Sequence, residues 1–288
     1  MTDREIARWQ NYELLDSGDG EKLERFGSKI LVRPDPLILW PKASPDLWSK
    51  ADLKYSRRAV RPGTREGEWE GENPNLTPWK ITWENLTFII KPTSFKHTGL
   101  FPEQSGNWDW IRKNIQPNQE VLNLFGYTGG ATLAAISAGA KVTHVDSSKP
   151  VVTWTKENIE LSGLPNDRCR LIVDDVIKFV RREITRGKKY QAIFLDPPAF
   201  GHGPAGEIWQ FEKDLAELLA SLTLLMESST GIIIVNAYSL GFPAIGLENL
   251  LQSYWPKATS LQSVELTLRE TTTRAFLLPT GVAVRVKW

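Results

Sequence analysis

The chain has 288 residues, 41% of them hydrophobic and 24% charged, and its formal net charge of +1 gives it no general attraction to nucleic acid or membrane. A single cysteine, Cys169, excludes a disulfide framework and a cysteine-based zinc cluster, and no metal site is expected. No run reaches the ~18 apolar residues of a membrane span, and the charged start MTDREIARWQ lacks the apolar core of a secretory signal. We therefore expect a cytoplasmic protein without a membrane partner.

Residues 1–95 are predicted to form a small β-rich domain, because prolines punctuate short runs in which apolar and polar residues alternate. The pair Glu84-Asn85 separates two such runs and predicts a hairpin turn. The runs predicted as strands are Lys29 to Arg33, Trp79 to Trp83 and Leu86 to Lys91.

Two compositional features of this part bear on its role, for which substrate recognition is one interpretation. Eight of the twelve tryptophans precede residue 111, which favours large rings in a small β core over rings that stack on bases or sugars. The stretch Lys54 to Arg65 has five basic residues and no acid. It suits a phosphate backbone or a solvated loop equally well.

A loop-like segment, His97 to Trp110, joins this part to the remainder, and Trp108 to Asn114 is predicted to form one or two helical turns. Because the segment directly precedes the first strand of the next domain, it can close over a ligand bound there. The alternative is a plain linker.

Residues 96–288 alternate strand and helix five times and end in two further strands, which predicts a doubly wound, mostly parallel, seven-stranded Rossmann-like sheet. The predicted strands are Val121 to Phe125, Lys141 to Val145, Arg170 to Val173, Tyr190 to Leu195, Gly231 to Ala237, Val264 to Thr271 and Phe276 to Lys287. The predicted helices are Ala131 to Ala138, 148–162, Val176 to Arg186, Leu215 to Met226 and Pro243 to Tyr254.

The stretch EVLNLFGYTGG, residues 120–130, predicts a strand, a glycine turn and a helix, so that free N–H groups at the helix start face a bound small molecule. Asp146 ends the next strand, twenty positions after Gly126, where a carboxylate can accept hydrogen bonds from ribose hydroxyls. Loop and acid together predict a nucleoside cofactor, either NAD or S-adenosylmethionine.

The sequence Asp196-Pro197-Pro198-Ala199-Phe200 follows a buried strand and favours the second cofactor. A proline pair removes two N–H donors and is expected to leave carbonyl oxygens beside the Asp196 carboxylate. These acceptors can hold an exocyclic amino group while Phe200 stacks on its ring, as in enzymes that grip an unstacked base. Hydride transfer needs no such arrangement. The alternative is a rigid loop with a buried Phe200.

At this point the chain resembles the class I S-adenosylmethionine-dependent methyltransferases, in the branch of the large-subunit ribosomal RNA methyltransferases of the RlmI and RlmK type. The resemblance covers Lys96 to Trp288 and rests on HTGLFPEQ, NLFGYTGGATLAAISAGA, VDSSK, VDDV and DPPAF, in that order. It implies that S-adenosylmethionine is the cofactor and that RNA, with ribosomal RNA as the candidate, is the partner.

The same resemblance implies a role for each matching residue. Asp146, with Ser147 after it, would take the ribose hydroxyls, and Asp175, with Asp174 beside it, would take the adenine amino group. Asp196, Pro197 and Phe200 would form the catalytic corner that faces the methyl acceptor, with Asp196 also beside the cofactor. The residues implied around the methionine part are Phe125, Gly126, Tyr127 and Gly129, with Thr98, Phe101 and Gln104 lining the same pocket.

Two departures from the family pattern shape the expected chemistry. Members that methylate carbon 5 of cytosine attack with a cysteine just after the fifth strand, where this chain reads Val235-Asn236-Ala237-Tyr238-Ser239. A base nitrogen is therefore the expected acceptor, since it needs no covalent step. Residues 1–95 also lack the pattern of the RNA-binding module usual in that branch. A protein side chain or small molecule as substrate, or a non-catalytic RNA-binding or assembly factor, remain alternatives, and NAD-dependent oxidoreduction is the most distant one.

Overall fold

The computed structural model describes residues 3–57, 67–72, 76–227, 229–238 and 242–288. Its chain forms two compact units. We call Met1–Glu5, Gly106–Leu266 and Thr280–Trp288 the α/β unit, and Ile6–Ser105 with Thr267–Pro279 the β unit. The sequence predicts one boundary near residue 95, whereas these units divide between Ser105 and Gly106 and each draws on distant parts of the chain.

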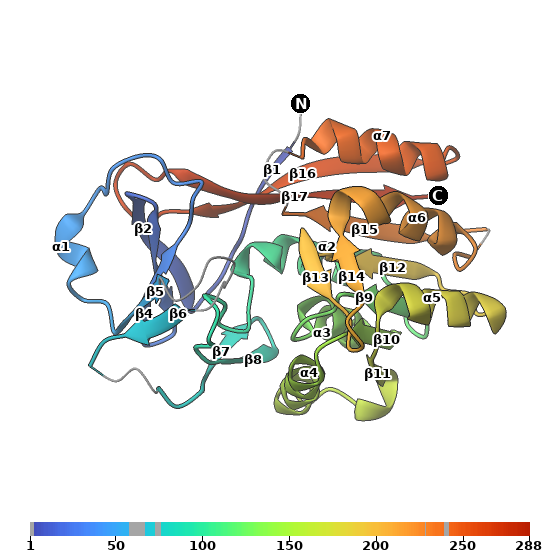
Figure 1. Cartoon of the computed structure of the whole chain (residues 1–288), viewed down its shortest axis with the longest axis horizontal. Helices are drawn as coiled ribbons and strands as arrows, with labels where there is room; N and C mark the ends of the chain where they lie inside the picture. Colours follow the sequence, from blue (N-terminus) through green and yellow to red (C-terminus); the bar gives the residue numbers. More distant parts are fainter. Residues whose placement is uncertain (1–2, 58–66, 73–75, 228, 239–241) are drawn as a thin grey trace. The chain divides into compact units, whose positions relative to one another are not determined.

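The main sheet has eight strands in the order β1-β16-β17-β15-β12-β9-β10-β11 (Figure 1). Strands β11, β10, β9, β12 and β15 pair in parallel, and β17 is antiparallel to β15. The strands are β1 (Asp3–Ile6), β9 (Glu120–Leu124), β10 (Lys141–Asp146), β11 (Cys169–Val173), β12 (Ala192–Leu195), β15 (Ile232–Ala237), β16 (Ser260–Arg269) and β17 (Leu277–Lys287). The predicted α/β class is confirmed, and the sheet gains one strand, β1, over the seven predicted.

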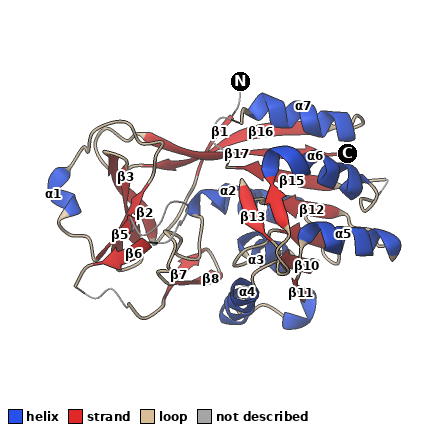
Figure 2. Ribbon diagram, in the orientation of Figure 1, coloured by secondary structure: helices blue, strands red, loops and turns tan. Residues whose placement is uncertain are grey.

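The helices are α2 (Ser105–Asn114), α3 (Gly130–Ser137), α4 (Lys149–Leu161), α5 (Val176–Thr185), α6 (Phe211–Thr223) and α7 (Ala244–Tyr254). Three-residue 3-10 turns, Pro102–Gln104 and Asn166–Arg168, precede α2 and β11, and a small hairpin, β13 (Phe200–His202) with β14 (Ile208–Gln210), leads into α6 (Figure 2). Within the described residues, every helix is too short or too polar to cross a lipid bilayer.

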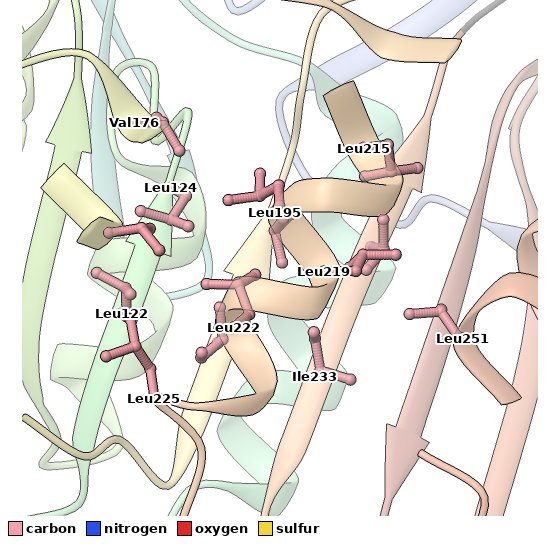
Figure 3. Packing of buried hydrophobic residues seen from close by; sticks show 14 of the residues in the cluster. Leu122, Leu124, Val176, Leu195, Leu215, Leu219, Leu222, Leu225, Ile233 and Leu251 are labelled. Carbon is pink, nitrogen blue, oxygen red and sulfur yellow. The ribbon is translucent and has the colours of Figure 1, made fainter. Parts of the chain in front are cut away.

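The two faces of the sheet carry different side chains because successive strand residues point to opposite sides. One face, which includes Leu122, Leu124 and Leu195, packs against α5, α6 and α7 in one apolar cluster (Figure 3). In α6 the residues facing this core, Leu215, Leu218, Leu219 and Leu222, repeat with helical spacing and are buried. Each buried leucine contributes about 1.5–3 kcal/mol, so this face holds the strand ends in fixed positions.

Strands make up most of the regular secondary structure described in the β unit. A five-stranded sheet has the order β2-β3-β4-β5-β6, and β7 and β8 form a separate hairpin whose turn residue Glu84 has φ 50°. The elements are β2 (Tyr12–Gly18), β3 (Glu21–Phe26), β4 (Lys29–Pro34), α1 (Pro45–Trp48), β5 (Leu53–Arg57), β6 (Gly67–Glu70), β7 (Trp79–Trp83) and β8 (Leu86–Ile90). The three strands and the hairpin turn predicted in this part are confirmed.

The tryptophans of the first 110 residues serve mainly as packing groups. None of the eight is exposed, and three, Trp69, Trp83 and Trp108, are buried. Other tryptophans donate their indole N–H groups to acceptors within the protein. Trp79 donates to the Phe26 carbonyl, and Trp48 donates to the Asp16 carboxylate. The core interpretation of the tryptophan enrichment is therefore supported. Most of the basic stretch Lys54 to Arg65 lies outside the described residues.

Buried ion pairs stabilise the β unit. Arg33 holds Glu24 through two hydrogen bonds of 2.6 and 2.7 Å, and the pair is buried. Burial alone would raise the pKa of Glu24, but the charges of Arg33 and Lys22 outweigh burial and lower it to about 2. Arg274 similarly joins Asp16 (3.2 Å) to Glu270 (2.7 Å), which explains why the segment Thr267–Pro279 belongs to this unit.

Candidate functional site

The glycine turn between β9 and α3 has an unusual backbone. Phe125 and Tyr127 have φ of 54° and 49°, and Gly129 has φ of 92°. Positive φ is uncommon for residues with a Cβ and costs on the order of 1–3 kcal/mol each. Gly126 is required for a different reason, since a Cβ there would collide with the His144 ring. The turn is therefore a strained structure that its surroundings hold in place.

Asp146, at the end of β10, holds this turn from one side. Its Oδ2 accepts the Tyr127 N–H at 3.0 Å and its Oδ1 accepts the Ser148 N–H at 2.9 Å. Burial raises the pKa of Asp146, while the hydrogen bonds from Ser148, Tyr127 and Ser147 oppose that rise. Each carboxylate oxygen can accept a further hydrogen bond, so the group suits a pair of ligand hydroxyls, as predicted for a ribose.

The polar residues beneath the turn were missed by the sequence analysis. Asn123, Thr132, His144 and Thr155 are all buried and joined by hydrogen bonds. The available signal was an asparagine and a histidine inside otherwise apolar strands, VLNLF and KVTHV. These residues face α3 and α4, on the side of the sheet opposite the leucine cluster.

Asp174 and Asp175 lie at the end of β11, beside Asp146. The Asp174 N–H donates to the Asp146 carbonyl at 3.1 Å. Both carboxylates also have structural duties, because Asp175 caps α5 by accepting the Lys178 N–H at 2.9 Å and Asp174 forms an ion pair with Arg182. Their predicted contact with an adenine amino group stays a prediction.

Asp196 lies at the end of β12, next to the glycine turn, since its N–H donates to the Leu124 carbonyl at 3.3 Å. The following proline corner differs from the expectation that its carbonyl oxygens remain beside the carboxylate. The Pro198 carbonyl accepts the Trp209 indole N–H at 2.7 Å, and the Ala199 carbonyl accepts the Phe211 N–H at 3.1 Å. Two of the corner's carbonyls thus anchor α6, which the sequence predicted as a helix, and the β13–β14 hairpin, which it did not predict.

The hairpin turns one face inward and one outward. Trp209 on the inner face is buried and contacts the Phe125 ring, with 4.8 Å between ring centroids. Phe200 lies on the other face and is 38% exposed, so the alternative of a buried Phe200 is excluded. Pro197, which directly follows Asp196 in the sequence, is buried.

Strand register brings most of the predicted residues of the α/β unit to one edge. Leu124 of β9 is opposite both Val145 of β10 and Leu195 of β12, so Gly126, Asp146 and Asp196 follow three adjacent strand ends. Cys169 begins β11 at the other end of the sheet, and burial raises the pKa of its thiol to about 12. That thiol is therefore protonated and remote from the predicted site.

Thr98, Phe101 and Gln104 belong to the β unit, and their place in a common pocket with the glycine turn stays a prediction. Thr98 nonetheless has a polar group that a ligand could engage. Its hydroxyl is buried and has no hydrogen-bond partner within the described part of the chain. A buried polar atom without a partner costs about 1–3 kcal/mol, which a bound ligand would recover.

These features fit the S-adenosylmethionine that the resemblance implies. The half-buried Asp146 carboxylate, the strained glycine turn and the start of α3 form one polar edge for a nucleoside. Asp196 and the exposed Phe200 border the same edge and can hold a flat acceptor. The residues predicted for the cofactor and those predicted for the methyl acceptor thus follow adjacent strands.

Comparison with known proteins agrees with this arrangement. A family model described as S-adenosylmethionine-dependent methyltransferase matches residues 49–273. A crystal structure of the SAM-dependent methyltransferase from Agrobacterium tumefaciens superposes with a TM-score of 0.92 at 33% identity, covering 100% of this chain and 93% of that one. A putative methyltransferase complexed with SAH has the same fold, with a TM-score of 0.72 at 17% identity over 98% of this chain and 76% of that one.

Several relatives are named as ribosomal RNA methyltransferases. Ribosomal RNA large subunit methyltransferase K of Neisseria meningitidis is 26% identical over 256 residues, which are 86% of this chain and 70% of that protein. Ribosomal RNA large subunit methyltransferase K/L of Shewanella frigidimarina is 33% identical over 151 residues, 52% of this chain but only 21% of that protein. The matched region is thus about a fifth of the K/L relative's length.

Proposed function

Because the chain belongs to the S-adenosylmethionine-dependent methyltransferase family, we propose that this enzyme methylates a nitrogen of an RNA base, with ribosomal RNA as the substrate class. The carrying observation is the position of Asp196 directly beside the glycine turn, fixed by its hydrogen bond to Leu124. A methyl donor and a flat amine acceptor need this adjacency, because methyl transfer requires the two reacting atoms in line and close together.

The acceptor side favours a nitrogen over a ring carbon. The cofactor supplies an already activated methyl group when bound, so the protein's task is to align a lone pair and exclude water. Asp196 can accept a hydrogen bond from an amino group on the acceptor, which orients its nitrogen. No cysteine occurs after β15, and Cys169 lies at the opposite end of the sheet. A thiol attack on a pyrimidine therefore has no group to perform it.

Support for RNA as the substrate comes from the exposed aromatic ring and the relatives. Phe200 presents its ring on the outer face of the β13–β14 hairpin, next to the Asp196 corner. Base stacking on such a ring contributes about 1–3 kcal/mol. The names of the Neisseria and Shewanella relatives specify the large ribosomal subunit, and such a substrate agrees with the cytoplasmic location predicted from sequence.

The test is incubation of the purified protein with S-adenosylmethionine carrying a labelled methyl group, first with total RNA and then with an RNA-free extract. We expect label in RNA, and nucleoside analysis should recover it on a base nitrogen. Asp196→Asn should transfer no label while it still binds S-adenosylhomocysteine, because the ribose carboxylate is intact.

Other outcomes would replace the proposal. Label that enters only the RNA-free pool would indicate a protein or small-molecule acceptor, an alternative that the near-neutral net charge of +1 leaves open. RNA binding without transfer to any pool would indicate a non-catalytic assembly factor.

A further inference from the structure

We propose that His144 is a positioning residue for cofactor binding, which acts through Thr155 to hold the strained glycine turn in its binding conformation. The proposal concerns the cofactor side alone, so it does not depend on which acceptor the enzyme methylates. His144 is 0% exposed and touches neither predicted ligand group, Asp146 or Asp196, through any hydrogen bond given by the structure.

The hydrogen bonds around His144 form one continuous chain. The Asn123 amide donates to the Thr132 hydroxyl oxygen at 2.8 Å, and that oxygen lies 2.9 Å from His144 Nδ1. On the other side of the ring, Nε2 lies 3.4 Å from the Thr155 hydroxyl oxygen. Thr155 in turn donates to the Tyr127 carbonyl at 2.8 Å. Side chains from β9, α3, β10 and α4 thereby converge on one backbone carbonyl of the turn.

The direction of each proton follows from these contacts. A hydroxyl has one proton, and Thr155 has three candidate acceptors, the Tyr127 carbonyl at 2.8 Å, the Val151 carbonyl at 3.2 Å and His144 Nε2 at 3.4 Å. We assign the proton to the nearest acceptor, the Tyr127 carbonyl, so the Thr155 oxygen accepts from His144 and Nε2 carries the proton. Nδ1 is then an acceptor for the Thr132 hydroxyl, whose oxygen takes the Asn123 N–H. Every donor in the chain has an acceptor when His144 is neutral.

The ring also shapes the turn sterically. It occupies the space below Gly126, where any Cβ would collide with it. The Thr155 methyl group lies 2.5 Å from the place of a Cβ at Gly129. His144 and Thr155 therefore pack closely against Gly126 and Gly129, the two glycines predicted to contact the cofactor, and they limit the positions that the turn can adopt.

The held carbonyl belongs to the residue whose N–H contacts Asp146. Tyr127 has φ of 49°, accepts Thr155 through its oxygen and donates to Asp146 Oδ2 at 3.0 Å. Release of the carbonyl would let Tyr127 leave its strained conformation and would remove one of the N–H groups that orient the Asp146 carboxylate. Both changes should weaken cofactor binding.

Thr155 offers a matched pair of variants. Thr155→Val keeps the shape and removes the hydroxyl, whereas Thr155→Ser keeps the hydroxyl and removes the methyl. Removal of the hydroxyl would take its 2.8 Å hydrogen bond from the Tyr127 carbonyl and its oxygen from His144 Nε2, and would leave the contact of the His144 ring with the Tyr127 backbone. The loss of a buried hydrogen bond costs about tenfold in affinity. We expect the Kd for S-adenosylhomocysteine, measured by calorimetry, to rise about tenfold in Thr155→Val and less than about threefold in Thr155→Ser.

Kinetics separate positioning from mere stabilisation. In Thr155→Val the KM for S-adenosylmethionine should rise in step with the Kd, with the KM for the acceptor unchanged and kcat within about twofold of wild type. Wild-type affinity for S-adenosylhomocysteine in Thr155→Val would overturn the proposal. If that variant does not fold, His144→Gln, which retains a donor toward Thr155, is compared with His144→Leu; equal affinities of these two would also overturn it. The binding measurement needs no acceptor, so a failed RNA assay leaves this result independent.

Discussion

At the scale of single residues, Asp146 is the side chain whose predicted contact with the cofactor can be tested most directly. Its oxygens accept backbone N–H groups, among them those of Tyr127 and Ser148, and the carboxylate keeps acceptor capacity for a ligand. Asp146→Asn replaces one acceptor by a donor and removes the charge, so hydrogen bonds worth about 1.5–3 kcal/mol each are lost. We expect the Kd for S-adenosylhomocysteine to rise at least about 100-fold in calorimetry.

The matched control for this change is Asp167→Asn. Asp167 is an exposed aspartate in the turn Asn166–Arg168, before the start of β11. Its substitution should leave the Kd unchanged. An Asp146→Asn protein that is folded by circular dichroism and binds as tightly as wild type would show that the ligand lies elsewhere.

His144 gives a residue-scale prediction about pH. Desolvation lowers its pKa to about 3, with the Tyr127 backbone opposing, from an ordinary value of 6.5. Between these values the unfolded chain binds a proton that the native chain does not, so this residue lowers stability as pH falls below about 6.5. At pH 5 the loss relative to pH 7.5 is about 2 kcal/mol.

Urea unfolding of wild type and His144→Gln at pH 7.5 and pH 5.0 measures this loss. The glutamine variant should be less stable at pH 7.5, and the difference should shrink by about 2 kcal/mol at pH 5.0 because glutamine does not titrate. Carboxylates titrate equally in both proteins and cancel. A difference that stays constant with pH would contradict the neutral, buried state of His144.

Among residues, the sequence singled out the groups that are expected to contact ligands but not the residues that support them. Asp146 stood out because an acid at a strand end has one obvious use in such a fold. His144 and Asn123 did not stand out. The hydrogen-bond partners of a polar residue within a strand can be identified only when the helices that pack against the strand are known. The engaged Pro198 carbonyl was mispredicted for the same reason, because its partner Trp209 lies eleven residues away in an unpredicted hairpin.

At the scale of elements, the β13–β14 hairpin holds the proline corner, Asp196 to Phe200, in place. Trp209→Phe removes the indole N–H that binds the Pro198 carbonyl and keeps an aromatic ring against Phe125. The corner should then move away from its catalytic geometry, and small misplacements at such sites cost up to about 10²-fold. We expect kcat to fall about tenfold, with the Kd for S-adenosylhomocysteine changed by less than about threefold.

The control for this variant is Trp288→Phe. Trp288 is half-buried and, like Trp209, donates its indole N–H to a backbone carbonyl, that of Glu227, but it pairs with Gly231 at the amino end of β15. It should lower stability without changing kcat. Equal losses of kcat in both variants would mean that the hairpin has no particular role.

Most elements of the α/β unit could be predicted because their apolar residues repeat with the period of a strand or helix. All five predicted helices and the seven predicted strands occur, with ends shifted by a few residues. The hairpin could not be predicted, since FGHGPAGEIWQ reads as a loop and is ordered by Trp209 and the Lys178–Glu207 ion pair. Strand β1 escaped for another reason, because its neighbour β16 begins more than 250 residues later.

At the scale of the whole molecule, the two compact units predict that the β unit can be destabilised separately from cofactor binding. A substitution in the Glu24–Arg33 pair should destabilise the β unit, because both groups are buried and removal of one leaves the other charge unpaired. Arg33→Met should therefore lower the free energy of unfolding by about 3–5 kcal/mol. Arg25→Met, on the neighbouring strand, removes a partly exposed pair with Glu13 and should cost under about 1 kcal/mol.

The same pair sets a pH window for the β unit. With the pKa of Glu24 lowered to about 2 from 4.5, its stabilisation is complete above about pH 4.5 and is lost as pH falls toward 2. Differential scanning calorimetry of both variants from pH 7 to pH 3 measures this, with the Arg33→Met protein less sensitive to acid in that range because its glutamate has lost its buried cation. Arg33→Met protein that retains wild-type affinity for S-adenosylhomocysteine would show that the α/β unit binds by itself, whereas lost affinity would assign Thr98, Phe101 and Gln104 of the β unit a share in binding, as the sequence predicts.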